Sequence, residues 1–175
     1  MDTKNRLQVE FTKAYDEYAD AIFRHCYFRI SDRERAKDLM QETFIKAWSY
    51  VLKRDEPIDN IRAFLYKIAS NLIIDEYRRT RKTSSLETLQ EDGFQIGIAE
   101  VITDNIGNKL ESEYVLRVIK RIDGKYREAV IMRYMDGLSP KEISEITGET
   151  QNNISVRISR GVKQLKEILK ENEKN

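Results

Sequence analysis

The residues best suited to bind another molecule are the amides, hydroxyls and arginines of the segment 151–160, QNNISVRISR. Such side chains hydrogen-bond to base edges in the major groove of duplex DNA, and arginine also pairs with phosphate. Apolar residues recur at helical spacing through and beyond the segment, so we expect one helix, capped by Thr150, with a buried stripe. The stripe comprises Ile154, Ile158, Val162, Leu165 and Leu169.

The polar face of this helix carries two sets of candidate contacts. Four residues near its start present amide or hydroxyl groups to bases, and two arginines lie further along, where phosphates or guanines would be. These residues are Gln151, Asn152, Asn153 and Ser155, followed by Arg157 and Arg160.

A shorter helix is expected just before it, in GLSPKEISEITG. Ser139 and Glu142 have the spacing of a capping box, Pro140 stands at the first helical position, and Gly148 allows a left-handed stop. Such a cap contributes about 1 kcal/mol, enough to fix where the helix begins. A short braced helix, a tight turn and a polar second helix predict a helix-turn-helix. The alternative is a helical hairpin with a solvated polar face.

A second candidate surface lies on an earlier helix that ends in NLIIDEYRRTRK. Aromatic side chains interleaved with basic ones suit single-stranded nucleic acid, whose bases stack and whose phosphates pair with cations. The alternative is that the tyrosines belong to the core and the cations form a solvated helix end that complements the macrodipole. One line of this helix holds Tyr66, Ser70, Ile73 and Tyr77, the next holds Lys67, Asn71, Asp75 and Arg78, and its end holds Arg79, Arg81 and Lys82.

A third polar surface is expected in AKDLMQETFIKAW, where Asp38, Gln41, Glu42 and Lys46 share one side of a helix. Asp38 and Glu42 are one turn apart and could hold a metal ion, but the only histidine, His25, is not nearby in the sequence. A solvated face or a partner-docking surface fits these residues better. We expect no metal and no cofactor.

Helical periodicity also predicts the elements that position these surfaces. Three amphipathic helices before residue 80 could enclose a small core that contains Trp48. Ser31 and Glu34 form a possible capping box for the second helix, and Asp59 or Asn60 is placed to cap the third.

The segment 83–108 keeps no period for long, which predicts a flexible linker. The expected fold class is therefore all-α, with two small helical domains joined by that linker. The expected domains are residues 1–82 and 109–175.

The composition indicates a soluble, helix-rich protein of the cytoplasm. Charged residues make up 35% of the chain, with two prolines and seven glycines, and no apolar run reaches the roughly 18 residues of a membrane span. The N-terminus lacks the apolar region of a secretory signal. A single cysteine, Cys26, rules out an internal disulfide framework and is most simply a small buried residue. The net charge of +1 is low for a protein that binds DNA unaided.

In three stretches the sequence resembles bacterial RNA polymerase sigma factors of the compact extracytoplasmic-function (ECF) type. DLMQETFIKAW resembles region 2.2, IRAFLYKIASNLIIDEYRR resembles regions 2.3 and 2.4, and residues 127–165 resemble region 4. The stretches follow in the family's order and cover nearly the whole chain. The low net charge fits this resemblance, because core polymerase would contribute most contacts and two docked DNA modules gain by effective concentration.

The resemblance implies core RNA polymerase as a partner. Region 2.2 would dock on the clamp coiled coil of the largest subunit, and the linker would thread towards the active-site cleft and the RNA exit path. The flap region of polymerase is a second implied contact. An anti-sigma factor is a further expected partner, and direct membrane insertion is not expected. The implied clamp-binding residues are Asp38, Gln41, Glu42 and Phe44.

Promoter DNA is the other implied partner. The loop 55–62 and the helix after it would capture the melted minus-ten strand. The helix 151–160 would read the minus-thirty-five element, with Ser155, Val156 and Ser159 towards the bases and its two arginines at the backbone. The implied minus-ten contacts are Asn60, Arg62, Tyr66, Lys67, Asn71, Arg78 and Arg79.

Three features depart from the family pattern. The second helix begins with QNN, where the family often has a small residue and a threonine, and Ser159 replaces a bulky side chain. Gly161 stands where alanine is usual, which would weaken the helix by up to about 1 kcal/mol. These departures bear on which promoter sequence the chain would recognise, and not on the class of protein.

Other functional classes account for fewer of these residues. A stand-alone helix-turn-helix regulator would bind palindromic sites tightly by itself, but it leaves DLMQETFIKAW unexplained and the sequence has no obvious dimerisation helix. A nuclease or recombinase would need a nucleophile or paired metal carboxylates, which the sequence does not support, so we do not expect an enzyme. A pure adaptor would not need amides and arginines on the second helix.

Overall fold

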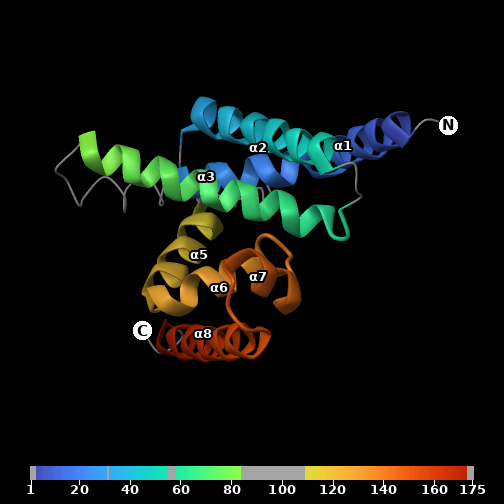
Figure 1. Cartoon of the computed structure of the whole chain (residues 1–175). Coiled ribbons are helices and arrows are strands. Elements are labelled where there is room, and N and C mark those ends of the chain that lie inside the picture. Colours follow the sequence, from blue (N-terminus) through green and yellow to red (C-terminus); the bar gives the residue numbers. More distant parts are fainter. Residues whose placement is uncertain (1–2, 31, 55–57, 84–108, 173–175) are drawn as a thin grey trace. The chain divides into compact units, whose positions relative to one another are not determined.

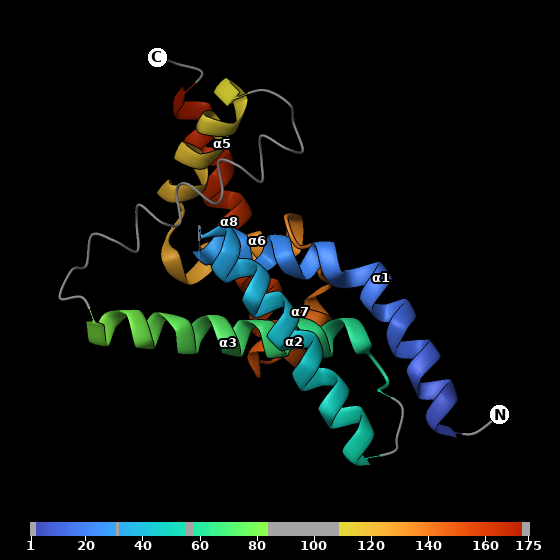
Figure 2. The same ribbon diagram turned by 90° about the horizontal axis from the view of Figure 1, so that it is seen from above.

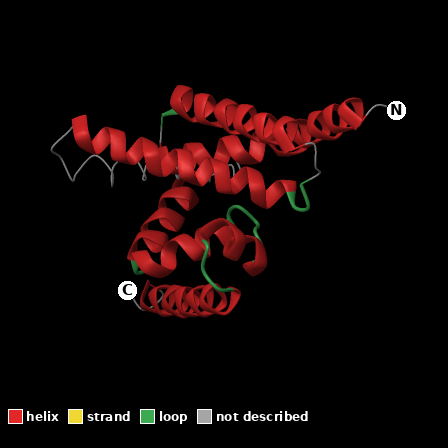
Figure 3. Cartoon of the chain, in the orientation of Figure 1, coloured by secondary structure: helices red, strands yellow, loops and turns green. Residues whose placement is uncertain are grey.

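The computed structural model describes residues 3–30, 32–54, 58–83 and 109–172, and every secondary-structure element in these ranges is an α-helix (Figures 1 and 3). The expected all-α class is confirmed. The chain forms two compact units, an N-terminal unit (Met1–Ile98) and a C-terminal unit (Ala99–Asn175). Ser31, residues 55–57 of the expected minus-ten loop, and all of the expected linker 83–108 except Thr83 lie outside the described ranges.

The described part of the N-terminal unit consists of three long helices: α1 (Thr3–Ile30), α2 (Arg33–Arg54) and α3 (Ile61–Thr83). Each packs on the other two, and Figure 2 shows α2 crossing α3. Their apolar faces enclose one core, in which Ile22, Leu39 and Leu65 are each at most 1% exposed. Burial of these faces determines which sides of α2 and α3 remain for partners.

Two features of this unit differ from expectation. Asp32 caps α2, because its Oδ1 accepts a hydrogen bond from the Arg35 amide at 2.9 Å. The helix therefore begins one residue later than a capping box of Ser31 with Glu34 predicts. Trp48 is half-buried and lines a surface groove instead of lying in the centre of the core.

Within residues 109–172, the C-terminal unit has four helices: α5 (Lys109–Arg121), α6 (Gly124–Tyr134), α7 (Pro140–Thr147) and α8 (Gln151–Asn172). The last of these packs against the other three. Near its C-terminal end Ile168 is the buried residue, and the expected stripe residue Leu169 is only half-buried. The main cluster contains Val118, Ile122, Val130 and Ile168.

The helix-turn-helix is formed by α7 and α8. Ser139 Oγ accepts from the Glu142 amide at 3.2 Å, and the Glu142 carboxylate accepts from the Ser139 amide at 2.8 Å, which confirms the capping box. Gly148 ends α7 with a φ of 75°, in the left-handed region that favours glycine. Thr150 caps α8, since its Oγ1 accepts from the Asn153 amide at 3.2 Å. Local chemistry therefore fixes both ends of the turn.

Close packing of α8 on α6 depends on Gly161. A Cβ at this position would lie 2.4 Å from Cγ2 of Val130 and 3.3 Å from Cβ of Tyr126. The first distance is far shorter than a van der Waals contact. The glycine that was expected only to weaken α8 thus lets the two helices approach each other.

Candidate nucleic-acid interface

The polar side of α2 is exposed, as a docking surface must be. Asp38 and Gln41 are exposed, and Glu42 forms an ion pair with Lys46 across 3.3 Å. Ile45 lies on the same helix and is 65% exposed, so an apolar residue stands among these charges. It follows Gln41 by four residues, and that helical spacing would have placed it on this face from the sequence alone.

Phe44 does not share this exposed surface. It is 4% exposed, and its ring packs against Tyr15 at a centroid distance of 4.8 Å and against Phe11 at 6.1 Å. Its ring is therefore part of the core between α1 and α2, and its expected contact with polymerase stays a prediction. Its packing holds α2 against α1.

The first turn of α3 holds two of the expected minus-ten residues. Asn60 caps the helix, with its Oδ1 accepting from the Ala63 amide at 3.0 Å, and Asp59 is therefore not the cap. Arg62 lies over the ring of Tyr66, with its Cζ 5.8 Å from the ring centroid.

One exposed line follows along α3. Lys67, Asn71 and Arg78 are exposed at helical spacing, as expected for residues that could meet a nucleic-acid strand. Arg78 also forms an ion pair with Asp75 across 3.5 Å, with both side chains largely exposed. Such a pair contributes little to stability and can exchange for a phosphate.

The neighbouring line of α3 faces α1 instead of solvent. Tyr66 is only 1% exposed and meets His25 edge to face, with ring centroids 4.9 Å apart. Ser70 Oγ lies 3.2 Å from His25 Nε2, and the Tyr77 hydroxyl donates to the Arg29 carbonyl at 2.5 Å. Tyr66 is therefore a core residue, as the alternative given for these tyrosines predicts, and its expected contact with the minus-ten strand stays a prediction.

These contacts form a buried polar network between α1 and α3. Arg29 Nη1 donates to His25 Nδ1 at 2.9 Å and to the His25 carbonyl at 3.0 Å. Because Nδ1 accepts, the imidazole proton lies on Nε2 and is donated to Ser70. His25 is fully buried and Arg29 is 8% exposed, so these bonds satisfy polar groups that burial would otherwise penalise.

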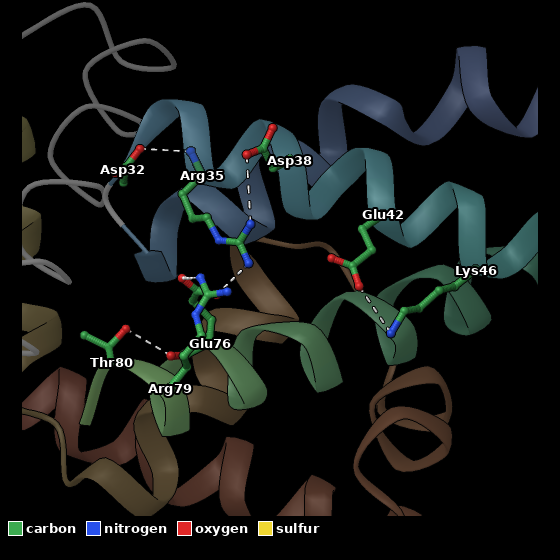
Figure 4. A network of polar contacts seen from close by, with 8 residues as sticks. All are labelled: Asp32, Arg35, Asp38, Glu42, Lys46, Glu76, Arg79 and Thr80. Atoms are coloured by element: carbon green, nitrogen blue, oxygen red, sulfur yellow. Dashed lines mark hydrogen bonds and ion pairs between the residues drawn. The ribbon is translucent and has the colours of Figure 1, made fainter. Parts of the chain in front are cut away.

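A second network joins the start of α2 to the end of α3 (Figure 4). Arg35 Nη2 lies 2.7 Å from Glu76 Oε2, and Arg79 Nη2 lies 2.7 Å from Glu76 Oε1. Arg35 also approaches Asp38 at 3.9 Å. The network thus connects Asp38, expected to bind polymerase, with Arg79, expected to bind the minus-ten strand.

The Arg35–Glu76 pair makes stability depend on pH. The hydrogen bond from Arg35 lowers the pKa of Glu76, although burial opposes this shift. The folded state therefore binds fewer protons than the unfolded state around the ordinary glutamate pKa of about 4.3. The stabilisation is present above that value and is lost as the pH falls through the lowered pKa.

We expect Glu76→Gln to lower the free energy of unfolding of the N-terminal unit by about 1 kcal/mol at pH 7. The difference from the parent chain should disappear in strong acid. Urea unfolding followed by fluorescence of Trp48, the single tryptophan, measures this at several pH values. An equal difference at pH 7 and in strong acid would contradict the assignment.

The predicted DNA-reading face of α8 is exposed at all but one of its candidate positions. Val156, at 39% exposure, is an exposed apolar residue of the kind that contacts a thymine methyl group. The exposed candidates are Gln151, Asn152, Asn153, Ser155, Val156, Ser159 and Arg160, and Arg157 is half-buried.

Both arginines of this face have partners within the C-terminal unit. Arg157 Nη2 lies 2.9 Å from Glu149 Oε2, and Arg160 Nη1 lies 3.5 Å from the Tyr126 hydroxyl. The hydrogen bond from Arg160, and then that from Lys125, lowers the pKa of Tyr126. Arg157 is thus held by an ion pair in the free unit, and Arg160 by a longer, exposed contact.

Sequence reasoning missed three cations beside this face. Arg133, Lys163 and Lys166 line a cleft of about 450 Å³ that Ser155 and Ser159 also line. Lys163 follows Ser159 by four residues, so the helical period could have identified it. Arg133 comes from α6, and only the fold brings it to this cleft.

Neither a metal centre nor a membrane helix is found in the described part of the chain. Within it, no three histidine, cysteine, aspartate or glutamate side chains gather as metal ligands would. Asp38 faces Arg35, and Glu42 faces Lys46. No helix in the described ranges combines the length and apolarity that a bilayer span requires.

Family models match both units. The model described as Sigma-70 region 2 matches residues 14–83, and the model described as Sigma-70, region 4 matches residues 112–165. Together these matches span more than half of the chain.

Similar proteins include the ECF RNA polymerase sigma factor SigW of Bacillus subtilis, which is 31% identical over 94% of this chain and 91% of that protein. The ECF RNA polymerase sigma factor BldN of Streptomyces coelicolor is 27% identical over 91% of this chain, which spans 60% of BldN. The sigma factor RpoE from Bartonella quintana, solved in complex with the anti-sigma factor NepR, has a TM-score of 0.61 at 24% identity. That match covers 92% of this chain and 97% of RpoE and shows a shared fold.

The matched regions occur in the order that the sequence motifs predicted, on a helical fold that RpoE shares. The chain belongs to the sigma-70 family, as a sigma factor of the ECF type, the class that binds core RNA polymerase and directs it to promoters.

Proposed function

We propose that the two units divide promoter recognition between them. Region 2 would bind the clamp of core polymerase through Asp38, Gln41 and Glu42 on α2 and would capture the minus-ten strand along α3. Region 4 would read the minus-thirty-five element with α8. The observation that carries this proposal is the exposed face of α8, with its amide, hydroxyl and arginine side chains. The capped ends of α7 and α8 fix the turn that positions this helix.

Within this proposal exposed or half-buried residues make the contacts and more deeply placed ones support them. The minus-ten contacts would be Arg62, Lys67, Asn71, Arg78 and Arg79, with Asn60 fixing the start of α3 and Tyr66 positioning Arg62. The cleft of Arg133, Lys163 and Lys166 would extend the basic surface beside α8. The domains would be residues 1–82 and 109–175, joined by residues 83–108.

The protein would work in the cytoplasm as a non-enzymatic partner of core polymerase. An anti-sigma factor would regulate it, since the related RpoE was solved in complex with one. Neither of its DNA-binding surfaces has to bind strongly alone, because docking on polymerase raises the effective concentration of both.

Size-exclusion chromatography with core RNA polymerase, followed by run-off transcription on genomic fragments, tests the proposal. We expect stable co-elution and new start sites that share two promoter elements. Tight duplex binding without co-elution would instead indicate a stand-alone regulator.

A matched variant separates the two units in this assay. Replacing Gln151, Asn152 and Asn153 by alanine changes only exposed side chains in the first turn of α8. This variant should still co-elute with polymerase and should lose the new start sites. Unchanged start sites would contradict the role of α8.

A further inference from the structure

Glu149 lies in the turn of the helix-turn-helix and faces the DNA-reading helix. Its Oε2 is 2.9 Å from Nη2 of Arg157. The Glu149 side chain is 29% exposed and the Arg157 side chain 41% exposed. Arg157 is one of the two arginines that the resemblance to sigma factors places at the DNA backbone, within the proposed role of α8. An acidic side chain therefore already occupies the guanidinium that a phosphate would need.

The backbone of Glu149 is held in position from α7. Ser144 Oγ donates to the Glu149 carbonyl at 2.6 Å, and the Glu149 amide donates to Thr147 Oγ1 at 3.3 Å. Thr147 in turn donates to the carbonyl of Ile143, a residue that is 0% exposed. With its backbone anchored in this way, the carboxylate remains beside α8.

Arg160 provides a contrast one turn further along α8. Its partner within the unit is a tyrosine hydroxyl, Tyr126, at 3.5 Å. That contact is long for a hydrogen bond and involves no carboxylate. Of these two arginines, only Arg157 has a carboxylate partner among the contacts that the structure describes.

We propose that Glu149 competes with DNA phosphate for Arg157 and thereby weakens binding of the free protein to duplex DNA of any sequence. The inference rests on the proposed function of α8. When a phosphate approaches, Arg157 must share or leave its carboxylate, and the remaining negative charge repels the DNA backbone. The freed carboxylate also takes up a cation, which offsets part of the counterion release that drives binding.

Fluorescence anisotropy of the full chain with a labelled mixed-sequence duplex tests this, at low and at increasing salt. We expect Glu149→Gln to tighten binding about two- to five-fold, the range set by partly exposed ion pairs. The slope of log K against log salt should steepen by up to about one unit. Glu145→Gln, which removes an exposed acid of α7 outside this pair, is the matched control and should have a smaller effect.

A double-mutant cycle with Arg157→Ala distinguishes the competition by Glu149 from the DNA contact of Arg157 itself. Arg157→Ala should weaken binding to the duplex. In the Arg157→Ala background, Glu149→Gln should tighten binding no more than Glu145→Gln does. Suppose that Arg157→Ala weakens DNA binding but Glu149→Gln tightens it no more than Glu145→Gln does, or still tightens it when Arg157 is absent. Glu149 then does not compete with phosphate for Arg157, and the DNA role of α8 stands. If Arg157→Ala leaves binding unchanged, the proposed DNA contact itself fails.

Discussion

Tyr66→Ala is expected to lower the free energy of unfolding of the N-terminal unit by about 3–5 kcal/mol, the usual cost of deleting a fully buried aromatic ring. The ring is 1% exposed, packs edge to face on His25 and supports Arg62. Its removal opens a cavity beside the buried polar network of α1 and α3. Urea unfolding followed by Trp48 fluorescence measures the loss, because the only tryptophan of the chain is in this unit.

Two further variants distinguish a core residue from a DNA contact at this position. Tyr66→Phe keeps the ring and should retain most of the stability. Lys67→Ala removes an exposed cation from the next position and should leave the unfolding midpoint unchanged while weakening binding to single-stranded DNA. If Tyr66→Ala unfolded at the parent's midpoint and lost only DNA binding, our structural assignment of the ring would be wrong.

Gly161→Ala is expected to destabilise the C-terminal unit by about 1–3 kcal/mol, the typical cost of overpacking. Helix propensity alone predicts the opposite, a gain of up to about 1 kcal/mol. Steric conflict should outweigh this gain because the new Cβ would meet Val130 Cγ2 at 2.4 Å. That methyl group is one bond from the Val130 Cβ and has little freedom to move away.

Thermal unfolding followed by circular dichroism measures this effect, and Trp48 fluorescence provides an internal reference from the other unit. The helical signal of the C-terminal unit should be lost at a lower temperature, while the Trp48 transition stays in place. Val130→Ala in the Gly161→Ala background should recover part of the loss by removing the conflicting methyl group. A higher unfolding temperature for Gly161→Ala would show that propensity dominates at this position.

Local sequence chemistry was sufficient to predict the features that depend only on residues close together in the chain. The capping box of Ser139 and Glu142, the left-handed Gly148 and the cap at Thr150 all follow from spacing over a few residues, and all are present. The same holds for the helical class and for the exposed face of α8, because the 3.6-residue period fixes which residues share a side. The order of the motifs along the chain was sufficient to identify the family.

Periodicity could not decide between two adjacent faces of one helix. Tyr66 and Lys67 lie on neighbouring lines of α3, and only the position of α1 determines which line is buried. Phe44 illustrates the same limit on α2, where the rings of Phe11 and Tyr15 from α1 cover it.

The sequence by itself therefore determined the helical class, the helix-turn-helix with its caps and the sigma-factor class, because each depends on short-range spacing or on motif order. Tertiary structure alone decided that Tyr66 and Phe44 are core residues, that Arg133 joins Lys163 in one cleft, and that Gly161 is a point of close approach. Each of these depends on atoms from segments far apart in the chain, such as His25 and Ser70, which are 45 residues apart. Helix packing fixes those distances, and no local pattern records them.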